Sequence, residues 1–583
     1  AYWLDQSGNN NDWTSNNLQE SDISVDSPTN NFATLNPNCC HQDMPITEGN
    51  TRISGDPSGG SFGVAGTIPI PSSGKWYWEV FVDTLDSNRP NHYYGVDETK
   101  ALDHRGTSQL GSGQISTSYV YQSNGNGTVN NGSESSYGAA WSDNDIIGVA
   151  LDMDNGTLKY YRNNTAESSG ANAFTGLGSK NLVPTFSLYK DGANAGSNVC
   201  VVNFGQDSSF AGNKTAQGNQ DSNDIGDFYY TPPTGFLALC TSNLPDVAVT
   251  PSEHFNTVLY TGDGGSSNAV TGVGFQPDWL WIKNRTNANS HSLVDSVRGE
   301  SAGALISQNT NAEDSIDRLN LDSDGFTLTG NYGFVNTNTD NYVSWNWKAN
   351  GSGSSNSNGS ITSTVSANAD AGFSIVSYSG NSTDGASIGH GLSKAPQIII
   401  AKARTADTSW YVYCDTIGTS KTLYLQNTNA ATTSGPPWTS VSSTTFAVNQ
   451  NNDYDPAWIN KSGNTYIAYC FHSVDGYSKV GQFSGNSNAD GTFVYTGFRP
   501  AFIMVKRTDS TGHWEIHDTK RDAINQSQMA RLFPNYNSAE SNDDGWDILS
   551  NGFKLRTTHS STNAGTIIYL AFAETPFKYS NAR

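Results

Sequence analysis

The chain has 583 residues, with 31 lysines and arginines against 54 aspartates and glutamates, which gives a formal net charge of −23 at pH 7. Nucleic acids and anionic membrane surfaces require a basic footprint on their partners, so this balance argues against both. No stretch approaches the roughly 18 consecutive apolar residues of a membrane-spanning helix, so no membrane insertion is expected.

The composition indicates a multidomain, all-β protein. Glycine occurs 58 times, and aromatic residues make up 11% of the chain. Disordered chains are poor in aromatic residues, whereas many short strands joined by polar turns are rich in both kinds of residue. At roughly 150 residues per domain, the length fits about four domains.

The first segment, residues 1–60, is rich in Asn, Asp and Ser. Its stretch Ser27–Pro37, SPTNNFATLNP, is typical of loops and edge strands. The segment is too polar to build a core of its own. We therefore expect it to lie extended against the domain that follows it.

The next segment, residues 61–245, carries a clear β pattern. Gly74–Val80, GKWYWEV, alternates between two faces as a strand does. Asp145–Met153 is followed by Asn155-Gly156, a type I′ turn signal, and then by a return strand at Thr157–Arg162. These elements predict a β-sandwich domain.

These motifs, together with Tyr94–Asp97 (YGVD) and Val202–Gly205 (VNFG), resemble the SPRY domain, a β-sandwich of the concanavalin type used for protein recognition. SPRY domains bind partners through loops at one end of the sandwich. By position, these loops include Asn88–Tyr93 and Tyr119–Asn124 here. The resemblance implies a ligand-binding set formed by Asn91, His92, Tyr93, Tyr119 and Tyr121.

A strand motif occurs three times in the remaining sequence. It reads GFQPDWLWIKNRT at Gly274–Thr286, GLSKAPQIIIAKART at Gly391–Thr405 and GFRPAFIMVKRT at Gly497–Thr508. Proline fixes φ and cannot donate to a ladder, so it marks the entrance of each strand. The three prolines are separated by 119 and 104 residues, which indicates tandem β-sandwich domains rather than short solenoid units.

The motif divides the C-terminal part into three repeats, residues 252–350, 371–476 and 477–583. Residues 351–370 are rich in Gly, Ser and Asn, which is the composition of a flexible and protease-sensitive linker. The second and third repeats join within a few residues, which predicts a stiff rod. Lys520–Leu532 is the one good candidate for a short helix.

Each repeat also carries basic residues at the end of the motif strand and an aspartate near the end of the following strand. We expect these groups to form ion pairs inside each repeat rather than to bind a ligand. The basic residues are Lys283, Arg285, Lys402, Arg404, Lys506 and Arg507, and the aspartates are Asp295, Asp415 and Asp518.

The six cysteines form no disulfide framework and no CxxC pair of a metal site. A protein that folds in a reducing cytoplasm is expected to keep them as thiols. They are Cys39, Cys40, Cys200, Cys240, Cys414 and Cys470.

No catalytic motif is present, and we predict that the protein is not an enzyme. His513, Glu515 and His517 would share one face of a strand and could offer a metal three ligands. An exposed strand face is the favoured interpretation of this trio.

No cofactor is expected, although Ca²⁺ remains an alternative. Asp152–Gly156 begins like a calcium loop, but a hairpin turn explains it better. Ser541–Asp547, SNDDGWD, is a weak candidate whose ligands would be Asp543, Asp544 and Asp547.

The repeats resemble modules of bacteriophage tail-fibre and other virion proteins. Ser387–Leu392 (SIGHGL), Tyr466–Gly481 (YIAYCFHSVDGYSKVG) and the Gly497–Thr508 motif carry this resemblance. It implies a protein that is synthesised in the bacterial cytoplasm and displayed, outside the cell, on the virion surface.

The interpretation that follows is a non-enzymatic virion surface protein, part of a tail fibre or related appendage, that recognises and adheres to the host. Its expected partners are a host surface receptor or glycan, other virion proteins and further copies of itself in an oligomer or fibre. Two alternatives stay open. One is a structural subunit of an extracellular filament or capsid decoration. The other is a polysaccharide depolymerase, which needs a pair of carboxylates in a cleft.

Overall fold

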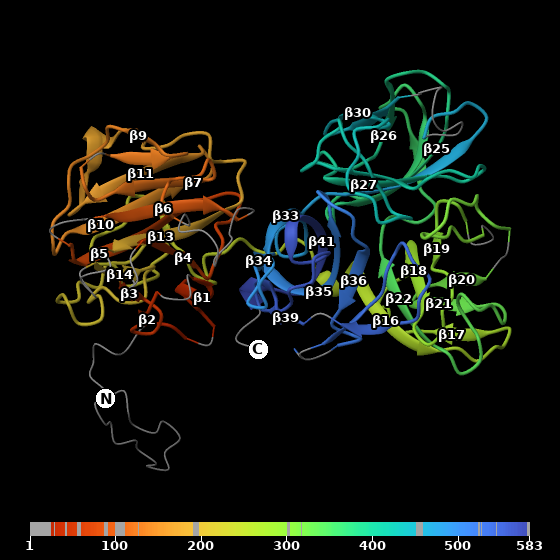
Figure 1. Cartoon of the computed structure of the whole chain (residues 1–583), viewed down its shortest axis with the longest axis horizontal. Helices are drawn as coiled ribbons and strands as arrows, with labels where there is room; N and C mark the ends of the chain where they lie inside the picture. The colour runs from red at the N-terminus through yellow and green to blue at the C-terminus, as the bar shows by residue number, and fades with distance from the viewer. Residues whose placement is uncertain are drawn as a thin grey trace, which may run out of the picture. The chain divides into compact units, whose positions relative to one another are not determined.

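A computed structural model describes most of the chain, and its regular elements are β-strands and short 3-10 helices (Figure 1). The all-β prediction is therefore confirmed. Within the described part, no helix is long and apolar enough to cross a membrane. The described residues are 25–27, 29–40, 44–54, 60–86, 91–99, 111–125, 127–190, 198–299, 303–315, 318–449, 459–522, 525, 528–543 and 545–579.

The chain forms two compact units, the first within residues 1–245 and the second from residue 246 onward. The first unit contains two large sheets. The strands of one sheet, in spatial order, are β1 (Leu35–Cys40), β4 (Gly60–Gly66), β13 (Leu182–Lys190), β6 (His92–Glu98), β7 (Ser118–Gln122), β8 (Thr128–Asn130) and β9 (Ser133–Ser135). Those of the other are β12 (Thr165–Ala166), β11 (Thr157–Arg162), β10 (Ile146–Asp152), β5 (Lys75–Thr84), β14 (Val199–Asn203), β3 (Arg52–Ser54) and β2 (Ile46–Thr47), with β15 (Leu237–Ala238) beside β5.

The two sheets of the first unit pack face to face. Tyr160 on β11 donates its hydroxyl to the carbonyl of Tyr94 on β6 at 2.9 Å, and Phe204 contacts both Trp78 of β5 and Phe186 of β13. The predicted hairpin is present, because β10 and β11 pair in register with Asp152 opposite Thr157. The predicted type I′ turn is wrong, because the loop spans residues 153–156 and Gly156 has a positive φ whereas Asn155 does not. A 3-10 turn, η3 (Glu167–Gly170), follows β12.

The N-terminal segment, where the structure describes it, supplies β1, β2 and β3 to these sheets. Phe32, Leu35 and Ile53 are buried in the core of the first unit. The described residues of this segment are therefore an integral part of the sandwich.

The second unit repeats one strand order three times, each time as a sheet built on four strands and a sheet of three strands. Two 3-10 turns flank it, η4 (Pro251–Glu253) and η5 (Phe577–Tyr579). In the first repeat the strands are β16 (Phe255–Thr261), β22 (Asn341–Trp347), β18 (Trp279–Asn284) and β19 (Ser292–Asp295), with β17 (Asn268–Val270), β21 (Gly325–Leu328) and β20 (Leu319–Asp322).

The second and third repeats add extra strands to this design. The second repeat has β23 (Ser354–Asn356), β24 (Ser363–Asn368), β25 (Phe373–Ser379), β32 (Thr465–Phe471), β27 (Ile398–Ala403), β28 (Tyr411–Cys414) and β29 (Leu423–Tyr424), with β26 (Ala386–Gly389), β31 (Thr445–Val448) and β30 (Trp438–Val441). The third has β33 (Ser478–Asn486), β41 (Ala564–Pro576), β35 (Phe498–Arg507) and β36 (Trp514–Asp518), with β34 (Phe493–Tyr495), β40 (Gly552–Leu555) and β39 (Trp546–Leu549), and the pair β37 (Met529–Arg531) and β38 (Ser541–Asp543).

Two local predictions are wrong. Residues 351–370 are not a loose tether, because β23 and β24 extend the sheet of the second repeat through β25. Ile361 and Val365 supply the apolar contacts that dock this stretch. The described residues of Lys520–Leu532 contain no helix, and the end of that range is β37.

The three repeats share one core, so the predicted stiff rod is also wrong. Alternate residues of each four-strand sheet point to opposite sides. Trp279 and Trp281 of β18 enter the core shared by all three repeats, whereas Leu280 and Ile282 enter the core of their own repeat. Aromatic side chains of all three repeats meet in the shared core.

Ring contacts link every pair of repeats in this core. Trp279 stacks on Tyr469 of the second repeat with centroids 4.3 Å apart. Trp347 meets Phe572 of the third repeat at 5.6 Å, and Phe471 of the second repeat meets Phe572 at 5.9 Å. The second unit is therefore a closed arrangement of three repeats around a common aromatic centre.

Replacement of Trp347 by alanine tests this shared core. Because Trp347 contacts rings of all three repeats, its loss should destabilise the second unit by about 3–5 kcal/mol. The measurement is thermal and urea unfolding of the full chain. Tyr536→Ala is the control, because that side chain is 54% exposed. Separate melting of the three repeats, with only the first affected, would contradict a common core.

Candidate binding surface and inter-repeat charge networks

The five residues implied as a ligand-binding set lie on or beside neighbouring strands of the first unit. His92 and Tyr93 belong to β6, Tyr119 and Tyr121 belong to β7, and Asn91 immediately precedes β6. Four of them are thus strand residues rather than loop residues. Loop residues 88–90, which the resemblance also suggested, lie outside the described residues.

His92 is a buried structural residue, so its assignment to an exposed binding set is wrong. Its Nδ1 lies 2.5 Å from the Tyr94 hydroxyl and its Nε2 lies 3.1 Å from Oδ1 of Asn198. Burial lowers the pKa of His92 to about 3, which keeps the ring neutral.

Tyr121 is also fully buried, and its assignment is wrong for the same reason. Its hydroxyl donates to the carbonyl of Ala139 at 2.8 Å and accepts from the Ala139 amide at 3.0 Å. The ring contacts Tyr137, Trp141 and Tyr160. It holds the loop at Ala139 against the sandwich core.

Asn91, Tyr93 and Tyr119 are partly exposed, but they do not form one patch. Tyr119 pairs with Val96, whereas Tyr93 pairs with Gln122, so the register places the two tyrosines on opposite faces of the sheet. Tyr119 is the one of the three that belongs to a defined cluster.

Tyr119 forms a half-buried cluster with Glu98, Phe174 and Lys180, which we call the Tyr119 cluster. The rings of Tyr119 and Phe174 meet edge to face at 5.5 Å. Lys180 lies 5.4 Å from the centroid of the Tyr119 ring and pairs with Glu98 at 2.6 Å. The Tyr119 hydroxyl also donates to Glu98, at 3.3 Å. Tyr119, Phe174 and Lys180 are each partly exposed, so the cluster combines two aromatic rings and a fixed cation at the surface.

Sequence pattern alone could not place Phe174 and Lys180 beside Tyr119, because both lie in an irregular segment far from Tyr119 along the chain. Only the fold brings them together. An aromatic residue and a basic residue after the β10–β11 hairpin were the available hint.

The trio His513, Glu515 and His517 does not form a metal site. Glu515 and His517 are fully buried and lie 3.8 Å apart, so the prediction of an exposed strand face is wrong for them. The smaller sheet of the third repeat covers them, with Trp546 against the His517 ring at 4.5 Å. His513 instead accepts a hydrogen bond at Nδ1 from the side-chain amide of Asn535, at 2.9 Å. The described residues contain no group of three metal-ligating side chains.

The calcium candidates receive no support from the side chains described. Asp544 and the side chain of Asp543 lie outside the described residues. Asp547 pairs with Arg556 at 2.5 Å. Asp152 accepts the amide of Asn155 at 3.0 Å, as a hairpin turn requires.

The basic residues of the repeat motifs have different partners from those predicted. Lys283, Lys402 and Lys506 are buried, and each donates to a backbone carbonyl next to it in sequence. Burial lowers the pKa of Lys283 to about 7 and that of Lys506 to about 8. The predicted pairing with Asp295, Asp415 or Asp518 of the same repeat is wrong. Arg285 and Arg404 reach into a neighbouring repeat, and Arg507 pairs with Asp509 of its own repeat.

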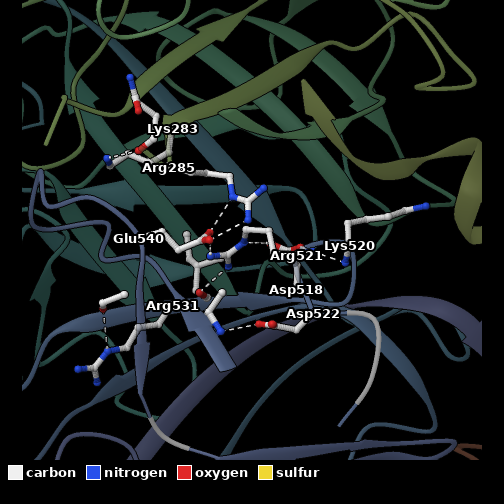
Figure 2. A network of polar contacts seen from close by, with 12 residues as sticks. Lys283, Arg285, Asp518, Lys520, Arg521, Asp522, Arg531 and Glu540 are labelled. Carbon is white, nitrogen blue, oxygen red and sulfur yellow. Dashed lines mark hydrogen bonds and ion pairs between the residues drawn. The ribbon is translucent and has the colours of Figure 1, made fainter. Parts of the chain in front are cut away.

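One network joins the third repeat to the first (Figure 2). Asp518 and Arg521 pair at 2.6 Å with no exposure of either side chain. Arg521 continues to Glu540 at 3.1 Å, and Glu540 receives Arg285 of the first repeat through two bonds of 2.7 and 2.8 Å. Trp345 of the first repeat donates its indole N–H to Asp518 at 3.0 Å. Two acids and two arginines make the network neutral.

A second network of the same design, built from different residues, joins the first repeat to the second. Asp295 pairs with Arg298 at 2.5 Å, and Arg298 lies 3.5 Å from Glu313. Glu313 receives Arg404 of the second repeat at 2.7 Å. Tyr469 of the second repeat donates its hydroxyl to Asp295 at 2.7 Å.

The interface of the second and third repeats replaces every member of this network. The strand register aligns Cys414 with Asp295 and Asp518, since these residues pair with Ile398, Trp279 and Phe502. Asp415 is therefore not the equivalent aspartate, although its spacing in the sequence suggested so. The replacements are Cys414, Ile417, Ala431, Thr508 and Leu570.

Backbone bonds confirm that the three interfaces correspond. The amide of Glu540 donates to the carbonyl of Arg285 at 3.0 Å, and that of Glu313 donates to Arg404 at 2.8 Å. At the third interface the amide of Ala431 donates to Thr508 at 2.8 Å. The cyclic arrangement is thus kept where the charges are absent.

A further bond recurs at all three interfaces. The indoles of Trp410 and Trp514 each donate to a carbonyl of the preceding repeat at 2.9 Å. His291 takes the corresponding place in the first repeat, with Nε2 2.9 Å from the carbonyl of Phe533. Trp281 donates to its Nδ1, which leaves Nε2 as the donor.

The comparisons with known proteins match two parts of the chain. A protein-family model described as "Domain of unknown function (DUF7483)" matches residues 250–576, and a model of the SPRY domain matches residues 75–207. The resemblance of the first unit to SPRY is therefore confirmed. A search among curated proteins finds no match.

Solved structures match the SPRY part at low identity. The crystal structure of the SPRY domain of human HERC1 is 18% identical, with a TM-score of 0.24, and the match covers 29% of this chain and 96% of that chain. Stonustoxin is 19% identical, with a TM-score of 0.22 and coverages of 30% and 26%. The TRIM65 PSpry domain is 17% identical, with a TM-score of 0.22 and coverages of 30% and 92%.

The pH dependence of stability tests the network of Figure 2. Burial raises the pKa of Glu540, but the hydrogen bond from Arg285 and the charge of Arg521 outweigh it, so the pKa lies below its usual value of 4.5. A carboxyl group whose pKa is lower in the folded protein than in the unfolded chain stabilises the fold at pH values above its unfolded pKa. This stabilisation is lost as the pH falls through the pKa of the folded state.

Glu540→Gln should therefore cost about 1.5–3 kcal/mol at pH 7, and the deficit relative to the parent should shrink below about pH 4.5. Urea unfolding at pH 7 and pH 3 measures both values. Glu134→Gln, at an exposed residue of the first unit, is the control. A deficit that is the same at both pH values would contradict the ionic role of Glu540.

Proposed function

We propose that this chain, which belongs to the family described as "Domain of unknown function (DUF7483)" and carries a SPRY domain, is a non-enzymatic binding protein of a bacteriophage virion surface. In this role it is part of a tail fibre or a related appendage. The first unit contacts a host surface receptor or glycan, and the second unit serves as the mount that holds it.

The Tyr119 cluster is the observation that supports binding by the first unit. Its two rings and its cation are fixed before any partner arrives, because Lys180 and Tyr119 both bond to Glu98. Preorganised side chains lose little conformational entropy on binding, and tyrosine combines a large contact area with a hydroxyl. A receptor loop or a sugar ring fits such a surface.

The closed second unit supports the role of a mount. Aromatic side chains of all three repeats pack in the shared core, and the acids and arginines of two interfaces neutralise each other. A rigid unit transmits force from the bound partner without changing the geometry of the first unit. Several copies in one appendage would add avidity to a weak single contact.

A structural subunit of a filament or capsid decoration is the second candidate. The observation in its favour is the head-to-tail character of the inter-repeat interfaces, since such interfaces also build open assemblies. A third candidate, a polysaccharide depolymerase, requires two carboxylates facing one cleft. Glu98 is the one acid of the Tyr119 cluster, and Lys180 neutralises it.

Binding of the intact protein to host cells or to immobilised glycans tests the proposal. The double variant Tyr119→Ala, Phe174→Ala should lose at least about tenfold in affinity, or about 1.4 kcal/mol, because both aromatic rings of the cluster are removed from the surface. Tyr93→Ala, at a partly exposed tyrosine on the opposite face of the sheet, is the matched control.

Multivalent display on beads allows a weak single contact to be detected. If the folded double variant binds as well as the parent, the Tyr119 cluster is not the binding surface. If the parent binds no surface and polymerises alone, the filament candidate replaces the proposal.

A further inference from the structure

Each repeat of the second unit presents two different surfaces to its neighbours. The arginine surface carries the position of Arg285 together with the position of Trp345. The carboxylate surface carries the positions of Asp518, Arg521 and Glu540. Every interface joins the arginine surface of one repeat to the carboxylate surface of another.

Each of these surfaces exists in a charged and an uncharged version. At every interface, the two surfaces that meet are of the same version. The second repeat has a charged arginine surface, with Arg404 and Tyr469, and an uncharged carboxylate surface. The third repeat has the reverse, with Thr508 and Leu570 on its arginine surface and a charged carboxylate surface. Two interfaces therefore join a charged arginine surface to a charged carboxylate surface, and the third joins the uncharged versions of the two surfaces.

The first repeat is the exception, because both of its surfaces are charged. Its arginine surface has Arg285 and Trp345, and its carboxylate surface has Asp295, Arg298 and Glu313. The two surfaces of this repeat are complementary to each other as well as to its neighbours.

The interface between the third and first repeats differs from the others in connectivity, since these repeats are not consecutive in the chain. The first is linked to the second through residues 348–353, which lead into β23, and the second to the third through residues 472–477. Non-covalent contacts alone close the arrangement. The closing network buries Asp518 and Arg521 completely. Without an arginine from the partner, its two acids and one arginine would keep one uncompensated negative charge at this buried site.

We propose that the carboxylate surface of the third repeat is a recognition surface for the arginine surface of a first repeat, and that a second copy of this chain can supply that first repeat. Within one chain the contact closes the three repeats. Between chains the same contact is heterologous and joins the copies head to tail or, by exchange, in a closed pair. The partner is selected by its arginine and by the aromatic N–H that reaches Asp518.

Two charge-reversed chains test this proposal. Arg285→Glu places a carboxylate opposite Glu540, and Glu540→Lys places an ammonium opposite Arg285, so neither chain can close its own second unit. When the two full-length variants are mixed, the intact Arg285 of one meets the intact Glu540 of the other. The reversed pair, Glu at 285 and Lys at 540, also matches in charge.

The expected result is a 1:1 assembly in the equimolar mixture, with a mass by light scattering about twice that of one chain, which neither variant forms alone. The double variant Arg285→Glu, Glu540→Lys restores the neutral sum within one chain and should recover the unfolding midpoint of the parent and the mass that the parent shows by light scattering. Arg507→Glu is the matched control, because Arg507 pairs with Asp509 of its own repeat. Mixed with Glu540→Lys, it should form no assembly.

A mixture whose mass and midpoint equal those of the separate variants would overturn the proposal. If a single variant does not fold alone, the two are refolded together. A soluble 1:1 product then supports recognition between copies, and aggregation of both chains refutes it. The readout does not involve host binding, so it is independent of the proposed function.

Discussion

The second unit depends on one constraint, which is that its four-strand sheets are apolar on both faces. A strand such as β18 sends tryptophans to one side and aliphatic residues to the other, and both sides must be removed from water. A three-strand sheet of the same repeat covers one side. The other side is covered only when three repeats meet, so no single repeat can bury all of its apolar surface.

Bringing three sheets together also buries polar groups at their margins, and each of these requires a partner. Two kinds of aromatic group, the indoles and the Tyr469 hydroxyl, therefore bond to carbonyls and carboxylates across the interfaces. The ammonium groups of Lys402 and Lys506 also donate to carbonyls of a neighbouring repeat. The neutral arginine–carboxylate networks solve the same problem for charges. A buried ion pair contributes modest net stability, but its mismatch is costly, so it acts mainly on specificity.

Much of the fold could be predicted from alternation and turn chemistry. The strand at Gly74–Val80, the hairpin at Asn155-Gly156 and the three proline-marked strands follow directly from local pattern, because backbone and side-chain periodicity are local properties. The prediction of which individual side chains are buried or exposed was wrong at several positions. Tyr121 and His92 are residue types that are common in binding loops, but both lie on strands with their side chains buried.

The charge networks were beyond reach of the sequence for a different reason. Glu313 and Glu540 lie in irregular segments without a shared motif, and Glu540 is 255 residues from its partner Arg285. The alignment of the second repeat also misled, because matching by residue type selected Asp415, whereas the strand register selects Cys414. The strand register shows that Cys414 is equivalent to the two aspartates, although its side chain is of a different chemical type.

The replacement of a whole network by uncharged residues has an evolutionary consequence. Cys414, Ile417, Ala431, Thr508 and Leu570 stand where the other interfaces have charged or hydrogen-bonding side chains. A single step between the two versions leaves a charge without its counterpart, so each substitution is tolerated only against the background of the others. The five positions are expected to show strong epistasis and to have diverged as a block, with the two halves of that block encoded in different repeats.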